Sequence, residues 1–204
     1  AHPLYGALHD AEYDVVTLDL RGTGALANPN DGILNAPDHN SAQWSIWIGR
    51  PLLGRWVRGV KGLLDAIDAA MQLPGGVAIV GVGPAGIVAM CAAALDDRIT
   101  QVAAVGALAS YVSDSPYKNQ RFGIVVPAIL REIGDIAHLA ALAAPRRLVI
   151  AGPVLGNGET LSKSAVAEQF QSVARVYELA GAKGRFSTDN QINVQTGVNE
   201  VKLS

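Results

Sequence analysis

Residues 77–90 read Val-Ala-Ile-Val-Gly-Val-Gly-Pro-Ala-Gly-Ile-Val-Ala-Met, and this stretch decides the fold. Its first part is a β-branched run that predicts a short buried strand, and its last part is an apolar run that predicts a helix. The glycines and the proline between them indicate a tight turn. The stretch therefore predicts a strand, a turn and a helix in immediate succession, which is the unit from which parallel sheets are built.

Composition limits what a site on this unit can bind. The chain has 204 residues, half of them apolar, with 16 basic and 18 acidic side chains. This size and apolar content predict one globular domain, residues 1–204, with a substantial core. The near-neutral charge balance argues against a nucleic-acid partner and against a basic membrane-binding patch. No apolar run reaches the ~20 residues that a membrane-spanning helix needs.

Metal ligands and disulfide partners are scarce. Cys91 is the only cysteine, so this sequence can form neither an internal disulfide nor a cysteine-based metal cluster. The histidines are scattered without the spacing of a zinc site: His2, His9, His39 and His138. We therefore expect no metal centre, and the cysteine content leaves the compartment open.

Segments on both sides of residues 77–90 predict further strands and helices. Strands are expected at 13–20, near 102–108, at 147–151 and, more weakly, at 184–189, and helices at 51–67, near 126–133 and at 164–180. The run at 13–20 is apolar along most of its length, as in a strand buried on both faces. This alternation predicts an α/β fold with a mostly parallel sheet and helices on both faces. Residues 191–204 form a polar tail without a clear signal.

One interpretation of the central turn is a dinucleotide site. Gly81, Gly83 and Gly86 match the G-x-G-x-x-G pattern that lays a pyrophosphate on a helix N-terminus, which would make the chain an FAD- or NAD-binding oxidoreductase domain. That mechanism also needs an acidic side chain about 20 residues further on to bind the ribose. No acid occurs between Asp97 and Asp114, so the expected partner is missing.

The second interpretation rests on the order of motifs along the chain, which resembles the second half of an α/β-hydrolase. The residues within these motifs resemble those of the acetyl xylan esterase-like branch of that superfamily. The matching segments are residues 15–24, 51–67, 77–99 and 142–148. The resemblance covers roughly residues 13–180. It implies an α/β-hydrolase-like sheet, carboxylic ester hydrolysis on carbohydrate esters, no cofactor, and a periplasmic or secreted location.

The resemblance conflicts with activity at the turn itself. In α/β-hydrolases this turn presents a nucleophilic serine, and the backbone N–H of the next residue forms half of the oxyanion hole. Here the serine position is Gly83, and the next residue is Pro84, which has no N–H. Loss of one oxyanion donor alone removes ~3 kcal/mol of transition-state stabilisation. We therefore expect an esterase-like domain that is non-catalytic or weakly active.

The remaining catalytic groups are also hard to place. The resemblance puts the acid after the strand that ends at Ala151, but no carboxylate occurs there before Glu159. Asp114, after the preceding strand, is the candidate substitute. The base belongs after the last strand, yet no histidine follows His138, for which a surface or capping role is expected.

Arg21, Ser110 and Tyr111 join Gly83 and Pro84 as pocket candidates, and Trp44 and Trp47 are candidates for carbohydrate contact. Each of these five further side chains has a structural alternative. Arg21 follows a predicted strand, where it could bind an anion or a substrate hydroxyl, or clamp backbone carbonyls. Ser110 and Tyr111 end another predicted strand and could bind a ligand or satisfy loop backbone groups. Trp44 and Trp47 could stack on a sugar ring or seal the edge of the core.

The sheet predicted from the resemblance has a gap. In an α/β-hydrolase, a strand from earlier in the chain separates the strand matched by residues 13–20 from the strand that leads to the nucleophile turn. Residues 13–20 must therefore pair directly with residues 77–81, or a further strand must enter from elsewhere. We expect the second arrangement, with another domain or subunit completing the sheet. A purely structural or oligomerising module is the remaining alternative.

Overall fold

The computed structural model describes residues 6, 8–10, 13–71, 73, 76–118 and 120–191. Its strands are β1 (Val77–Val82), β2 (Ile99–Val105), β3 (Arg147–Ala151) and β4 (Phe186–Asp189). Its α-helices are α2 (His39–Trp47), α3 (Leu52–Met71), α4 (Pro84–Leu95), α5 (Ile129–Glu132), α6 (Ile136–Ala141), α7 (Lys163–Gln169) and α8 (Gln171–Leu179). Short 3₁₀ turns lie at Gly24–Leu26, Phe122–Ile124 and Lys183–Arg185. Of the predicted tail at 191–204, all but residue 191 lies outside the described residues.

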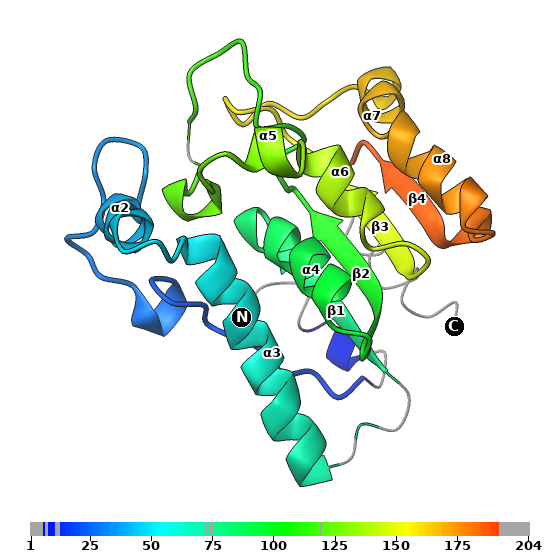
Figure 1. Cartoon of the computed structure of the whole chain (residues 1–204), viewed down its shortest axis with the longest axis horizontal. Helices are drawn as coiled ribbons and strands as arrows, with labels where there is room; N and C mark the ends of the chain where they lie inside the picture. Colours follow the sequence, from blue (N-terminus) through cyan, green and yellow to red (C-terminus); the bar gives the residue numbers. More distant parts are fainter. Residues whose placement is uncertain are drawn as a thin grey trace.

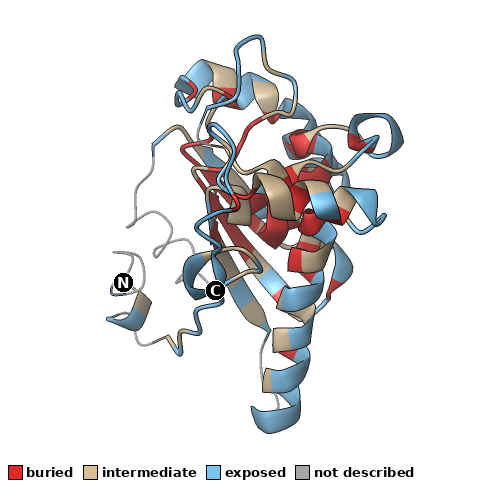
Figure 2. Cartoon of the chain, turned by 90° about the vertical axis from the view of Figure 1, so that its left-hand side faces the viewer, coloured by how far each residue is buried: buried red, intermediate tan, exposed pale blue. Residues whose placement is uncertain are grey.

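The described strands form one parallel sheet in the order β1-β2-β3-β4 (Figure 1). Each strand therefore pairs with the next one along the chain, and right-handed crossovers in such a sheet place every connecting helix on the same face. Helices α4, α6 and α8 fill these crossovers and contact one another in that order, and Figure 2 shows the buried helices on one side of the sheet. The predicted α/β fold with a parallel sheet is confirmed, whereas helices were predicted on both faces and the crossover helices α4, α6 and α8 lie on one.

The main core lies between the sheet and this helical layer. The side chains of Val102, Ala104, Leu148 and Ile150 belong to it. The alternate residues of the same strands, Ala103, Val105, Val149 and Ala151, are also buried but lie outside that cluster. Because successive side chains in a strand point to opposite faces, β2 and β3 are buried on both faces. This explains why both strands are continuous apolar runs in the sequence.

Residues 13–20 do not form the predicted strand. They have no regular secondary structure, and within the described residues β1 pairs with β2 alone. Val16 is 60% exposed and Leu18 is 41% exposed. Apolar content predicts that a segment will be buried, but a strand also needs a neighbouring strand to pair with, and a sequence pattern does not reveal whether one is present.

Two predicted helices also differ in the structure, one by being divided and the other by being shorter. The helix predicted at 164–180 is divided into α7 and α8 at Phe170, which leaves helical geometry (φ −106°, ψ 14°) and is fully buried. The helix predicted near 126–133 is reduced to α5, which begins after Ala128 in a left-handed conformation (φ 66°). Alanine rarely adopts that conformation, so the sequence did not indicate that the helix begins only after residue 128.

A buried carboxylate connects the end of α4 to α3 through hydrogen bonds and ion pairs. Asp96, which lies between α4 and β2, accepts hydrogen bonds from Lys61 Nζ at 3.0 Å and from Arg98 Nη2 at 2.7 Å. Arg98 also contacts Asp65 of α3 at 2.6 Å. The hydrogen bond from the Arg98 side chain, more than any other contact, holds the pKa of Asp96 well below its usual range against the opposing effect of burial.

We predict that Asp96→Asn lowers the free energy of unfolding by about 2 kcal/mol at pH 7, because charge-assisted hydrogen bonds are lost. The lowered pKa means that the contribution of Asp96 is fully present above about pH 4 and is lost as the pH falls towards the folded-state value. Urea unfolding at pH 7 and pH 3 measures both effects. Asp114→Asn is the matched control, because Asp114 is exposed. Equal urea midpoints for Asp96→Asn and the unsubstituted chain at pH 7 would contradict this account.

Candidate functional site

The turn between β1 and α4 holds Gly83 in an unusual backbone conformation. Gly83 has φ 58° and ψ −128°, its N–H donates to Val105 O at 2.7 Å, and its carbonyl accepts from Gly86 N at 2.9 Å. A Cβ atom built on Gly83 would meet no heavy atom within 4 Å. Residue 83 is therefore presented outward from a sharp strand-to-helix turn, which is how α/β-hydrolases expose their nucleophile.

The two flanking glycines are explained by packing. A Cβ atom on Gly81 would overlap the carbonyl oxygen of Ala85, and one on Gly86 would lie 2.9 Å from Ala107 Cβ and 3.1 Å from Ala104 Cβ. Both distances are shorter than ordinary carbon contacts. These glycines therefore allow α4 to lie directly on β1 and β2, whether or not a ligand binds at the turn.

This packing predicts that Gly81→Ala destabilises the chain by about 1–3 kcal/mol, because the added methyl group would overlap the backbone of α4. Gly62→Ala is the matched control. Gly62 lies in α3, and a Cβ atom added there would meet no heavy atom within 4 Å, so alanine should stabilise the helix by about 0.5–1 kcal/mol. Thermal or urea unfolding of the two variants checks the prediction, and a neutral Gly81→Ala would contradict it.

The turn offers neither a nucleophile nor the usual oxyanion donor. Gly83 has no side chain, and Pro84 is the first residue of α4, where its missing N–H leaves the helix intact. Cys91 lies within α4, and burial raises the pKa of its thiol to about 11. The thiolate form is therefore scarce near neutral pH, so Cys91 is a weak candidate for the missing nucleophile.

Ser110, Tyr111 and Asp135 meet beyond the carboxyl end of β2. Ser110 Oγ donates to the Asp135 carboxylate, and Tyr111 N donates to Asp135 Oδ1 at 2.7 Å. Asp135 also caps α6 through Ile136 N at 2.8 Å, and its own N–H donates to His138 Nδ1 at 3.0 Å. Sequence reasoning missed Asp135, although an acidic residue three positions before a polar side chain at a helix start is a capping signal.

This cluster does not have the geometry of a catalytic triad. His138 Nδ1 bonds to the backbone of Asp135, and the Ser110 hydroxyl bonds directly to the carboxylate. A triad requires the imidazole to lie between these two groups. Tyr111 donates through its hydroxyl to Ile124 O at 2.9 Å, and burial raises the pKa of this phenol well above its usual value. Ser110 and Tyr111 therefore make structural hydrogen bonds within the protein. His138 has the capping role expected for it.

The other predicted site residues make none of the hydrogen bonds of this cluster. Asp114 is exposed in the loop that follows Tyr111. Arg21 is exposed and lines a groove at the start of α3, whose lining does not include Gly83. Trp44 and Trp47 are 62% and 64% exposed and meet edge to face at 5.0 Å. The alternative that these two rings seal the edge of the core is therefore wrong.

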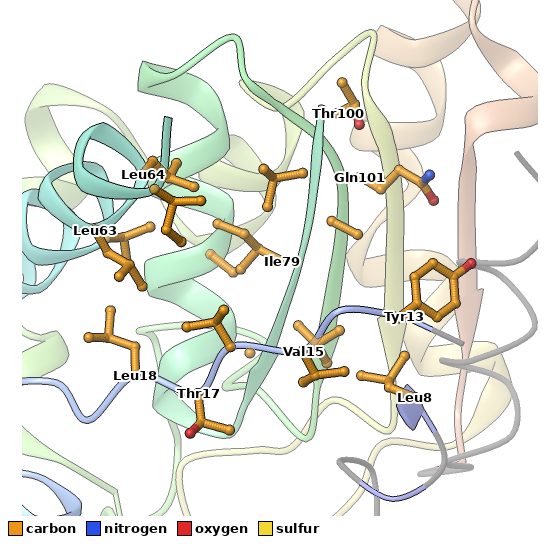
Figure 3. A pocket seen from close by; sticks show the side chains of 18 of the residues that line it. Leu8, Tyr13, Val15, Thr17, Leu18, Leu63, Leu64, Ile79, Thr100 and Gln101 are labelled. Atoms are coloured by element: carbon orange, nitrogen blue, oxygen red, sulfur yellow. The ribbon is translucent and has the colours of Figure 1, made fainter. Parts of the chain in front are cut away.

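A cavity of about 1250 Å³ lies beside the outer edge of β1 (Figure 3). On the side of α3 it is lined by Val60, Leu63, Leu64, Ile67 and Met71. On the side of the sheet it is lined by every residue of β1, and residues 13–18 cross it. The cavity is thus bounded by an apolar helix face and by a strand edge that has no partner within the described residues.

Metal and membrane sites are not found along the described residues. These residues contain no group of three or more side chains placed to hold a metal ion. None of the described helices has the length and apolar content to cross a membrane.

The sequence matches no protein-family model and no curated protein. The fold is similar to that of a carbohydrate esterase family 15 glucuronoyl esterase from Caldicellulosiruptor kristjansonii (TM-score 0.56, 20% identity, 74% of this chain and 49% of that one). It is also similar to a putative acetyl xylan esterase from Bacteroides fragilis (TM-score 0.61, 13% identity, 84% and 45%). A methylesterase gives a TM-score of 0.57 at 20% identity, with 90% and 38% covered.

These similarities establish the class of fold. The described part of the chain has the α/β-hydrolase fold found in esterases, as its resemblance to the acetyl xylan esterase-like branch implied. The chain spans less than half the length of each of these proteins. At such identities the likeness concerns the fold, and activity has to be argued from the site.

Proposed function

We propose that this chain is part of an α/β-hydrolase-like protein related to carbohydrate esterases, and that its own nucleophile turn is non-catalytic or weakly active. The observation that carries the proposal is Gly83, which retains the outward-facing backbone geometry of the turn without a side chain. Pro84 removes the neighbouring N–H donor at the same place. Ordinary acyl-enzyme chemistry needs both groups.

Carbohydrate contact is supported by the exposed aromatic pair on α2. Trp44 and Trp47 present large rings to solvent, side by side on one helix. Exposed aromatic rings that the core does not use are typical of binding surfaces. A carbohydrate ester is therefore the ligand class we propose for this protein.

We predict that the 204-residue chain hydrolyses p-nitrophenyl acetate and acetylated xylan no faster than about tenfold above the buffer reaction, since loss of a triad nucleophile lowers kcat by ~10⁶. Gly83→Ser should gain less than tenfold, because the new hydroxyl would have neither an imidazole base nor the Pro84 N–H. Gly83→Ala is the matched control for backbone strain at φ 58°. Robust turnover by the unsubstituted chain, or a large gain in Gly83→Ser alone, would overturn the proposal.

The alternative is an FAD- or NAD-binding oxidoreductase domain that uses Gly81, Gly83 and Gly86. Packing against Ala85, Ala104 and Ala107 accounts for the first and third of these glycines without a cofactor. Residues 106–108, which follow β2, contain no acid that could bind a ribose. An absorbance spectrum of the purified protein distinguishes the two functions, because flavin bands would favour the alternative. A structural or oligomerising module is the third interpretation, and it predicts neither activity nor cofactor.

The proposal extends to a partner that completes the sheet. The outer edge of β1 faces an apolar cavity of about 1250 Å³, and Val82 beside it is 42% exposed. Gly83 N–H donates towards β2, so alternation along the strand directs the N–H groups of Ala78, Val80 and Val82 to the outer side. A strand edge like this one, which has no partner within the described residues, is a template for another strand. We propose that another domain or subunit supplies that strand.

Hydrogen exchange of individual amides tests this partner. In the isolated monomer, the amides of Ala78, Val80 and Val82 should exchange quickly, while those of Ile79 and Gly81 should be protected by β2. Light scattering on the same sample identifies the monomer. Fast exchange at the even positions that becomes slow in an oligomer or longer product would support the proposal. Equal protection of all five amides in a stable monomer would show it to be wrong.

A further inference from the structure

A groove of about 530 Å³ lies beside the first turns of α3 and is lined by four arginines and three glycines. These residues, with Pro51, define the arginine groove: Arg21, Gly49, Arg50, Gly54, Arg55, Arg58 and Gly59. Its volume is in the range of small-molecule sites. The lining contains no carboxylate, so the groove concentrates positive charge.

Separate parts of the chain converge to build this groove. Arg21 follows the irregular segment 13–20, and its carbonyl accepts a hydrogen bond at 2.8 Å from Nε1 of the buried Trp56. Arg50 lies just before α3 and is fixed by its N–H, which donates to Ser45 O at 2.8 Å. Arg55 and Arg58 are one turn apart on α3. The hydrogen bonds from Trp56 and to Ser45 therefore hold the backbone of the groove in place.

The arginines of the groove differ from others in the described chain. Arg98, Arg131, Arg146 and Arg175 each form an ion pair with a carboxylate. Within the described residues, the side chains of the four groove arginines form no ion pair or hydrogen bond with the protein. Arg55 and Arg58 are spaced i, i+3 on one helix, an arrangement that is destabilising for like charges. The positive charges of the arginines in the groove therefore repel one another, and a bound anion would reduce this repulsion.

The glycines of the groove have no packing role. Cβ atoms built on Gly49, Gly54 and Gly59 would meet nothing within 4 Å. Glycine weakens a helix interior, so Gly54 and Gly59 are unfavourable for α3 itself. Their effect is to leave the helix surface bare between the arginines. A ligand can therefore approach the backbone closely, near a helix start whose first turn contains no acidic residue.

We propose that the arginine groove binds a ligand carrying two or more oxyanion groups, either phosphates or carboxylates. Guanidinium groups bind both by paired, charge-assisted hydrogen bonds, and several arginines around one space favour a ligand with more than one negative charge. The two sources of this chemistry are a free polyphosphate and an acidic saccharide. The site is separate from the turn at Gly83, so the inference does not depend on ester hydrolysis.

The first test is calorimetric titration of the full chain at low salt with inorganic pyrophosphate and with trigalacturonate, and with maltotriose as the neutral control. We expect one charged probe to bind and maltotriose not to bind. Arg55→Gln/Arg58→Gln should weaken that binding at least tenfold. Arg131→Gln/Arg175→Gln, which removes the same charge from exposed positions, should change it less than twofold. The tighter charged probe identifies the source.

Absence of binding by both charged probes, or equal weakening in the two double variants, would overturn the proposal. A second measurement needs no variant. In an amide NMR titration of the unsubstituted chain, pyrophosphate or trigalacturonate should shift the resonances of Gly49, Gly54 and Gly59. Shifts confined to Gly83 and Gly86 would instead place the anion at the turn after β1 and would also overturn it.

Discussion

Helix α4 lies directly on β1 and β2 because residues 81 and 86 carry no Cβ atom. Gly81 faces the carbonyl of Ala85 and Gly86 faces the methyl groups of Ala104 and Ala107, so any larger residue would lift the helix from the sheet. The rest of the helical layer follows from this contact, since α6 packs on α4 and α8 packs on α6. The same contact fixes the turn that presents Gly83. One steric constraint thus determines both the core and the geometry of the candidate site.

The turn keeps the shape of a nucleophile turn without its chemistry. Gly83 adopts φ 58° and ψ −128°, a conformation that most residues avoid, and its open side faces free space. The polar groups beyond the carboxyl end of β2 serve the fold, because the Asp135 carboxylate accepts hydrogen bonds from Ser110, Tyr111 and the start of α6. Chemistry at this edge would therefore have to come from groups outside these contacts. In the arginine groove, the side chains of its four arginines form no ion pair or hydrogen bond within the described residues.

Local patterns in the sequence predicted most of the central fold. The strand β3 was predicted at its observed limits, and the amphipathic run after Pro51 predicted α3, because burial on one face leaves a clear periodicity. Residues 13–20 were predicted wrongly, since a strand depends on a partner that the local sequence does not encode. The loss of the serine and of the N–H donor at Gly83 and Pro84 was evident from the residue types alone. Asp135 and the convergence of four arginines were not, because both arise from contacts between segments far apart in the chain.

The central claim is that this α/β-hydrolase-like chain contains no activated serine. Incubation with a serine-directed fluorophosphonate, followed by intact-mass spectrometry, measures this most directly, because the reagent needs an activated hydroxyl and makes no demand on the substrate. The account predicts an unchanged mass for the folded chain under conditions that label an active serine esterase completely. A stoichiometric adduct on Ser110, or on any other serine, would contradict it.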